Sequence, residues 1–424
     1  IMDVDSHHLM RRITLCEYDP VRFMELKEEV YRLASTDLFD DMMVTFDEVT
    51  LPDPVQTPAH SRRAYVKSEP DLAYLIVNQE EQIDSQLTFR SSILTAGSKA
   101  AMLTGTQEIS QKQLADLLNR IEAQNFTFDR LTTFGSDLTN LVLHESISAA
   151  LKEMQQYHLV VVNDARASQI PWETICIDGW FPAAHQGMSR RYAAADLSVA
   201  KWLEQRRIGD TLDVLLVVNP TLDLQGAERE GERIKHLFPR DSSVRLHEIR
   251  GKEATRDALL EQFKSGNYDV IHYAGHAYFD PVERSRSGMI CYGRQVLNGT
   301  HLAEISKLPA LLFFNACESA RVRRGAVKND SNLSIEERSN RNVGLAEAFM
   351  RGGAANYVGT YWPVGDDAAA AFSETFYKNL VLGASIGKAL QKGRDEVRKV
   401  KSLDWADYVH YGSYDFVLKH RNNE

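Results

Sequence analysis

The sequence predicts an α/β fold with a doubly wound, mainly parallel sheet. From about residue 206 onward, short apolar runs of strand length alternate with amphipathic stretches of helical length. Such alternation is typical of βαβ units, in which a helix crosses over between two parallel strands. Residues 66–205 are less regular and predict a preceding α+β subdomain, and residues 1–65 form a separate N-terminal segment.

The first half of the chain predicts a few separate elements. Phe23, Leu26, Val30 and Leu33 give residues 20–36 the apolar stripe of a helix. A proline-rich stretch at 50–63 reads as a loop or boundary. Further on, we expect two strands within 72–95 around the polar residues 78–82, helices over 107–124 and 144–156, and a buried strand over 158–162.

The second half predicts one continuous α/β unit over 206–424. The expected strands lie at 212–218, 244–249, 269–274, 310–314 and 355–359, with a hairpin near 288–297. The expected helices lie at 226–238, 255–265, 344–351, 366–381 and 385–399. In an open sheet of this kind, ligands and catalytic groups gather at the carboxyl ends of the strands.

Composition narrows the class of protein. A content of 43% hydrophobic and 25% charged residues indicates a globular chain, and a net charge of −10 argues against a general nucleic-acid binder. The four cysteines contain no CxxC pair, which favours neither a disulfide framework nor a thiolate zinc site and suggests a reducing, cytoplasmic setting. No apolar run approaches the roughly 20 residues of a membrane helix. The N-terminus lacks an apolar signal core, and a start at Ile1 is consistent with a piece of a longer protein.

Two strand ends nominate a cysteine–histidine dyad, His276 and Cys317. Each residue follows an apolar run, in His272-Tyr-Ala-Gly-His-Ala277 and in Leu311-Leu-Phe-Phe-Asn-Ala-Cys317. A cysteine thiolate attacks carbonyl carbon, and a neighbouring imidazole takes or shares its proton. The backbone N–H groups of Ala277 and Cys317 would face the same space, as the two donors of an oxyanion hole do.

Each of these residues alone also fits an ordinary role. A cysteine after an apolar strand is commonly a buried, inert thiol. His272 and His276 have the H-x-x-x-H spacing of a zinc site, but they lie on a predicted strand without an adjacent acidic ligand, so we expect no metal and a core position for His272. The stretch 383–388 is similar to a phosphate loop with one residue too few, and we interpret it as a helix start.

Both dyad segments resemble the catalytic motifs of the CHAT family, caspase-like cysteine peptidases of the same clan as separase. Three further blocks agree with the family's order: Ile170-Pro-Trp-Glu173, Gly359-Thr-Tyr-Trp-Pro-Val-Gly-Asp366, and Phe376-Tyr-Lys-Asn-Leu-Val-Leu-Gly383 with Ser385 and Ala389-Leu390. The resemblance implies a module of two halves, a degenerate caspase-like subdomain over 66–205 and an active one over 206–424. It implies no cofactor. Residue 277 is Ala where caspases carry Gly. Asn-Ala-Cys-Glu-Ser replaces the caspase cysteine motif, and this second departure argues against an Asp preference at P1.

The loops that build a caspase-type pocket are acidic here. They contain Asp223, Asn315, Asp366 and Asp367 and no arginine, which favours Lys or Arg at P1, although loop acids are also common for turn reasons alone. The polar, basic stretch 320–342 follows the cysteine, where it would serve as a processing loop or as a plain linker.

These residues predict an endopeptidase that cleaves a protein partner and is switched on by an activating protein or sensor domain. The resemblance places it in bacterial defence or cell death, with no nucleic acid or membrane expected as a partner. The alternative is a catalytically silent CHAT-like binding scaffold.

Overall fold

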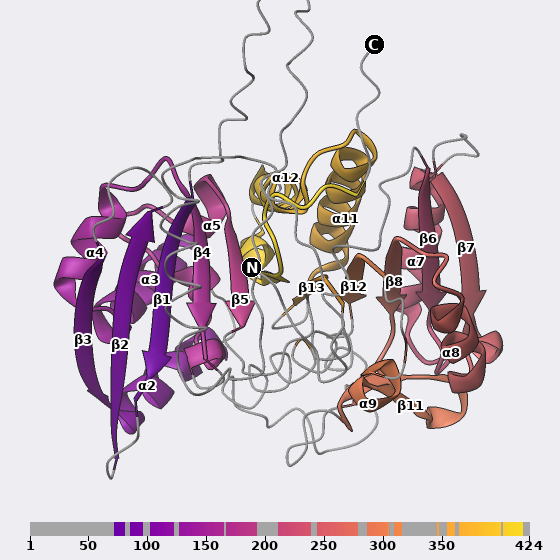
Figure 1. The fold of residues 1–424 in the computed structure, drawn as a ribbon, viewed down its shortest axis with the longest axis horizontal. Coiled ribbons are helices and arrows are strands. Elements are labelled where there is room, and N and C mark those ends of the chain that lie inside the picture. The colour runs from indigo at the N-terminus through magenta and orange to yellow at the C-terminus, as the bar shows by residue number, and fades with distance from the viewer. Residues whose placement is uncertain are drawn as a thin grey trace, which may run out of the picture. The chain divides into compact units, whose positions relative to one another are not determined.

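Eleven of the described strands join into one mainly parallel sheet, which confirms the predicted fold class (Figure 1). The computed structural model describes residues 72–80, 85–95, 102–122, 127–164, 167–192, 211–238, 244–278, 286–303, 305, 309–315, 346, 354–360, 364–399 and 402–418. All of them belong to one unit, Val66–Glu424. The helix expected over 20–36 and most of the one over 344–351 lie outside the described residues.

The sheet runs without a break through both halves of the chain. Its order is β3-β2-β1-β4-β5-β14-β13-β12-β8-β6-β7. The strands β1–β3 pair antiparallel, as do β13 and β14, and the other neighbours are parallel. Their bounds are β1 Leu72–Gln79, β2 Gln86–Thr95, β3 Leu103–Ser110, β4 His158–Asn163, β5 Met188–Tyr192, β6 Leu212–Val218, β7 Val244–Arg250, β8 Val270–Ala274, β12 Leu311–Asn315, β13 Asn356–Thr360 and β14 Tyr408–Tyr411.

Helices cover both faces of the C-terminal half of the sheet. Alternate residues of each strand face opposite sides, so Phe313 of β12 packs toward α11 and α12 while Phe314 packs toward α8 and a small second sheet. The continuous apolar run 214–218 of β6 fits this double burial. The helices are α2 Gln111–Leu118, α3 Phe128–Val142, α4 Glu145–Lys152, α5 Pro182–His185, α7 Gln225–Leu237, α8 Arg256–Ser265, α9 Gly299–Ala303, α11 Asp366–Val381 and α12 Ile386–Lys399. The second sheet joins β9 Ala277–Tyr278, β10 Gly288–Ile290 and β11 Val296–Asn298.

The expected helix over 107–124 is wrong at its start. Residues 103–110 form β3, which pairs with β2, and α2 begins only at Gln111. Ser110 sets this boundary, because its hydroxyl accepts from the N–H of Gln113 and the Gln113 side chain accepts from the N–H of Ser110. This reciprocal capping box stabilises a helix start at that residue and at no earlier one.

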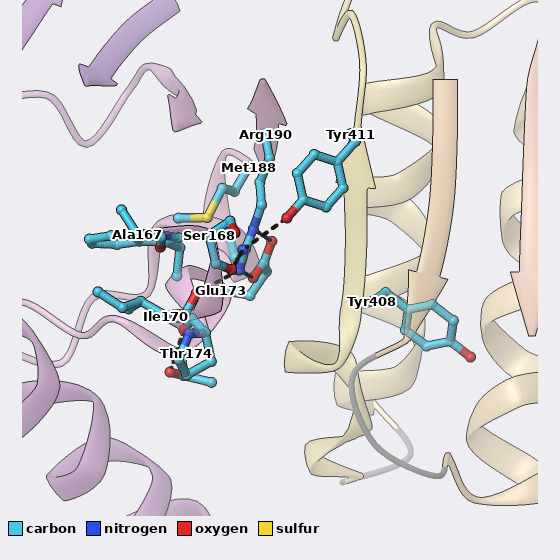
Figure 2. A network of polar contacts seen from close by, with 12 residues as sticks. Ala167, Ser168, Ile170, Glu173, Thr174, Met188, Arg190, Tyr408 and Tyr411 are labelled. Atoms are coloured by element: carbon cyan, nitrogen blue, oxygen red, sulfur yellow. Dashed lines mark hydrogen bonds and ion pairs between the residues drawn. The ribbon is translucent and has the colours of Figure 1, made fainter. Parts of the chain in front are cut away.

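A buried ion pair lies where β5 meets β14, at the junction of the two halves. Glu173, from the Pro-Trp-Glu block, pairs with Arg190 of β5, and neither side chain is exposed. Arg190 donates through Nε to Glu173 Oε1 at 2.9 Å and through its terminal nitrogens to Glu173 Oε2, to the carbonyls of Ser168 and Ile170, and to the hydroxyl of Tyr411 (Figure 2). All five guanidinium N–H groups therefore have acceptors.

Two neutral histidines continue this junction. The hydroxyl of Ser189 lies 3.0 Å from Nε2 of His158 and 2.8 Å from Nδ1 of His410, and Nε2 of His410 donates to Asn356 Oδ1 at 3.1 Å. Burial, together with the positive charge of Arg394, lowers the pKa of His410 to about 3. Burial likewise lowers the pKa of His158 well below its ordinary value. Both imidazoles are thus uncharged at neutral pH.

Candidate active site

His276 stands two residues beyond the end of β8, at the carboxyl edge of the parallel sheet. The N–H of Gly275 donates to the Asn315 carbonyl at 3.3 Å, so the turn after β8 stays attached to β12. The buried hydroxyl of Tyr273 lies 2.6 Å from the His276 carbonyl and holds the backbone there. The His276 imidazole keeps 15% of its surface exposed, so it is accessible from the edge of the sheet.

Asp223 is the partner of this histidine. Nε2 of His276 donates to Asp223 Oδ1 at 3.0 Å. Burial raises the pKa of Asp223, but hydrogen bonds from Thr221 and His276 and the charge of His276 outweigh that effect, so its pKa lies below the ordinary value. An ionised Asp223 accepts a hydrogen bond from Nε2–H, and in this tautomer of the neutral imidazole Nδ1 of His276 has a lone pair. Nδ1 is therefore the nitrogen that can accept a proton from a nucleophile.

The loop between β6 and α7 aims Asp223 at the histidine. Asn219 and Leu222 have positive φ values of 44° and 65°, a conformation that asparagine tolerates and that is unfavourable for leucine. The side chain of Asn219 holds the loop, because it donates to Glu228 Oε1 at 2.8 Å and accepts from the N–H of Leu224 at 3.1 Å. Backbone strain of this kind is typical of functional sites. The sequence places Asp223 in a pocket wall, and in the structure its carboxylate contacts Thr221, His276 and Arg294.

Asn315 ends β12 and is bound by a carboxylate from α7. Its Nδ2 lies 3.0 Å from both oxygens of Glu230, and Glu230 Oε1 also accepts from Nε2 of His272 at 3.0 Å. His272 is fully buried, stacks on Phe313 with ring centroids 4.7 Å apart, and has Nδ1 at 2.7 Å from the Tyr377 hydroxyl. His272 thus has the core position that we expected. Within the described residues, no group of three potential metal ligands occurs.

Glu230 is the residue of this site that sequence reasoning missed. It lies in a charge-rich helix, Gln225–Leu237, where no single carboxylate stands out. A signal was present in the spacing, because the buried residues Ala227, Gly231 and Ile234 define one helical stripe and Glu230 adjoins it. A charged residue next to the buried stripe of a helix is a candidate for a specific internal contact.

The N–H of Ala277 points away from its neighbouring strand. Ile290 donates its N–H to the His276 carbonyl at 3.0 Å, which makes His276 and Ile290 a hydrogen-bonded pair. In antiparallel strands the next pair, Ala277 with Met289, is then a non-hydrogen-bonded one. The Ala277 N–H therefore faces the side of β9 opposite β10, where a ligand oxygen could accept from it.

The remaining predicted site residues cannot be placed. Cys317 and the stretch 320–342 lie outside the described residues, as do the side chains of Asp366 and Asp367, although the backbone of both aspartates starts α11. In the sequence, Cys317 follows Asn315 by two residues. Of the predicted site residues, the structure thus describes His276, Ala277, Asp223 and Asn315 at one edge of the sheet.

A family model for the CHAT domain matches residues 132–413, about two-thirds of the chain. The chain belongs to the CHAT domain family. The match includes β4 to β14, and with them both motifs on which the resemblance in the sequence rested. No curated protein matches this CHAT chain.

Among solved structures, this CHAT chain is similar to separase from Saccharomyces cerevisiae in two crystal structures of the separase–securin complex. In the structure at 3.0 Å resolution the TM-score is 0.47 with 14% identity, over 81% of this chain and 30% of the separase chain. In the structure at 2.6 Å resolution the TM-score is 0.39 with 17% identity, over 72% and 20%. The chain thus spans less than a third of the separase chains that it matches. None of the described helices is both long and apolar enough to cross a membrane.

Proposed function

We propose that this CHAT protein is a cysteine endopeptidase in which Cys317 is the nucleophile and His276 is the general base. The observation that carries the proposal is the register of two parallel strands. Ala274 of β8 pairs with Asn315 of β12, and each dyad residue follows its member of that pair by two positions. Neighbouring strands lie about 4.8 Å apart, and two residues of chain span at most about 7 Å. This supports an encounter of the thiol and the imidazole at the same edge.

Asp223 acts as the orienting acid in this proposal. By accepting from Nε2 it fixes the imidazole so that Nδ1 can take the proton of the Cys317 thiol. The thiolate sulfur attacks the peptide carbonyl carbon and forms a tetrahedral oxyanion, and the N–H groups of Ala277 and Cys317 donate to that oxygen. His276 then gives its proton to the leaving amine, which departs and leaves a thioester.

Water completes the reaction. His276 takes a proton from the water molecule, whose oxygen attacks the thioester carbonyl carbon. Collapse of the second tetrahedral intermediate breaks the C–S bond, releases the new carboxyl terminus and returns the proton to the sulfur. No cofactor is required, since thiol, imidazole and water balance every proton and electron pair.

The substrate is a protein partner, cleaved after a basic residue. Asp223 contacts His276, so Asp366 and Asp367 are the remaining predicted acids for the pocket wall, together with Asn315. Cleavage is switched on by an activating protein or sensor domain, in a bacterial defence or cell-death response. The family membership and the acidic loops support this assignment.

A panel of fluorogenic peptides tests the activity and its P1 preference. Peptides with Arg, Lys, Leu and Asp at P1 are offered to the wild type and to Cys317→Ala, each with and without cell extract as a source of activator. We expect cleavage after Arg and Lys by the wild type alone. Cleavage after Asp or Leu would refute the basic preference, and equal cleavage by Cys317→Ala would refute the nucleophile. Binding of a partner without any cleavage by the wild type would favour the silent scaffold.

A further inference from the structure

A cavity of about 480 Å³ lies between α7 and α11, beside Asn315 at the end of β12. Its volume is in the range of small-molecule and side-chain sites. The lining divides by burial: Glu230, Asn315 and Ser373 form the inner wall, whereas Arg229, Arg233 and Glu374 are exposed at the rim. The buried part of the lining thus combines these polar groups with the apolar side chains of Ile234 and Val364.

The carboxylate of Glu230 has no Lys or Arg partner among the described residues. Its side chain is only 11% exposed, and it accepts from Nε2 of His272 and from Nδ2 of Asn315. A buried carboxylate is normally paired with a cation, because desolvation of the charge is costly. Of the two side chains that donate to Glu230, His272 is the one that could carry a positive charge.

The two hydrogen bonds of His272 indicate which of its nitrogens faces Glu230 with a proton. Tyr377 is fully buried, and burial with the negative charge of Glu230 raises its pKa well above the ordinary value, so its hydroxyl keeps the proton. The described partner of that hydroxyl is Nδ1 of His272. The hydroxyl can donate there only if Nδ1 carries no proton, which leaves the single imidazole proton on Nε2, facing Glu230. The charge of Glu230 is then not neutralised by this neighbour.

Hydrogen-bond acceptors predominate on the inner wall. A carboxylate has about four lone-pair sites, and the contacts of Glu230 leave capacity on Oε2. Asn315 spends Nδ2 on Glu230, so its Oδ1 remains as an acceptor. Ser373 is 3% exposed, and its hydroxyl has no hydrogen-bond partner among the described residues. A buried hydroxyl that lines a cavity can hydrogen-bond to a polar group that enters it.

We propose that this cavity binds a guanidinium or ammonium group, which would pair with Glu230 and hydrogen-bond to Ser373. Such a group brings only donors and one positive charge, which is what the inner wall lacks. Arg229 and Arg233 at the rim are engaged in interactions of their own. Their positive charge favours a ligand that is neutral or acidic outside its cationic end. A peptide that carries an arginine or lysine side chain is such a ligand. Binding here needs no thiol chemistry and does not rest on the proposed peptidase activity.

Calorimetric titration with two small probes of equal shape tests the charge preference. Benzamidine and benzoate are titrated into Cys317→Ala protein, so that turnover plays no part. We expect benzamidine to bind with one site and benzoate not to bind. Binding of benzoate in place of benzamidine, or of neither, would overturn the proposal. This comparison needs no change within the cavity.

Two variants assign the binding to Glu230. Glu230→Gln should weaken benzamidine binding about tenfold or more, the usual effect of removing a charge-assisted hydrogen bond. The matched control is Glu374→Gln, a rim carboxylate of the same cavity that already pairs with Lys378, and it should change affinity less than twofold. Equal weakening by both variants would contradict the assignment. Ser373→Ala, which leaves the carboxylate in place, should weaken binding by a smaller factor.

The wild type then shows where the basic group comes from. If benzamidine raises the KM of an arginine peptide without changing kcat, the group belongs to the substrate. If benzamidine binds and leaves peptide cleavage unchanged, the group belongs to another protein. Either result supports a cationic site.

Discussion

Replacing Glu173 by Gln should destabilise the protein far more than loss of a surface ion pair does. Glu173 and Arg190 are both fully buried at the junction of β5 and β14. Glutamine keeps the size of the side chain but removes the charge and one of the two acceptors that Arg190 uses (Figure 2). The guanidinium would remain in the core with its positive charge unpaired, since its other acceptors are two carbonyls and a hydroxyl.

The expected magnitude follows from this geometry. Breaking a buried pair by changing one partner costs about 3–5 kcal/mol, against a total stability of about 5–15 kcal/mol for a folded domain. With a urea m-value of about 3 kcal/mol/M, the lower figure shifts the unfolding midpoint by about 1 M. Urea unfolding followed by circular dichroism and by tryptophan fluorescence measures this shift.

Asp178→Asn provides the control for this experiment. Asp178 pairs with Lys152 on the surface, and this variant also replaces a paired carboxylate by an amide. Exposed pairs contribute little because water and salt screen them, so the midpoint of Asp178→Asn should stay where it is. A shift below about 0.3 M for Glu173→Gln, about 1 kcal/mol, would show that the core tolerates an unpaired Arg190 and would refute the reasoning.

Three further predictions concern pH, the histidine tautomer and the basic loop. Because the folded-state pKa of His410 is about 3, against about 6.5 unfolded, its stabilising effect is complete above pH 6.5 and is lost as pH falls toward 3. From pH 7.5 to 5 the free energy of unfolding should fall by about 2 kcal/mol, and the urea midpoint should fall with it. If the midpoint of His410→Gln depends on pH as steeply as that of the wild type, this prediction is wrong. Asp223→Asn should lower kcat by about 100-fold or more, and by more than Asp223→Ala does, because an amide N–H facing Nε2 imposes the wrong tautomer on His276. A larger loss of kcat in Asp223→Ala, measured by steady-state kinetics, would exclude the orienting role. The activated enzyme should nick itself between 321 and 342, as intact-mass spectrometry would show; a full-length chain during active substrate cleavage makes that stretch a plain linker.

The central strands were predictable because they are buried on both faces. Residues 214–218 of β6 and 311–314 of β12 are continuous apolar runs, and this pattern depends on no partner elsewhere in the chain. The strand β14 has the sequence Tyr408-Val-His-Tyr411, in which buried His410 contacts Asn356 and the hydroxyl of buried Tyr411 accepts from Arg190. Those partners are distant in sequence, so no local pattern could reveal them.

The site was predictable at its strand ends and not in its side-chain partners. His276 stood out because a reactive residue followed an apolar run and a glycine. Asp223 was visible as a loop acid, but the direction of its side chain depends on positive φ values at Asn219 and Leu222. Neither residue is a glycine, so the sequence did not indicate these φ values. The inward orientation of the Glu230 side chain depends on how α7 is rotated about its axis, and packing of the helix against the sheet sets that rotation.

The pH dependence of Cys317 alkylation tests the central claim most directly, because it measures the coupling of the thiol to His276 without an activator or substrate. Wild type and His276→Ala are treated with iodoacetamide between pH 5 and 10, and modification of Cys317 is followed by peptide mass spectrometry. The account predicts an apparent thiol pKa below about 7.5 in the wild type and a return toward about 8.5 in His276→Ala. Superimposable profiles near pH 8.5 for both proteins would contradict the dyad.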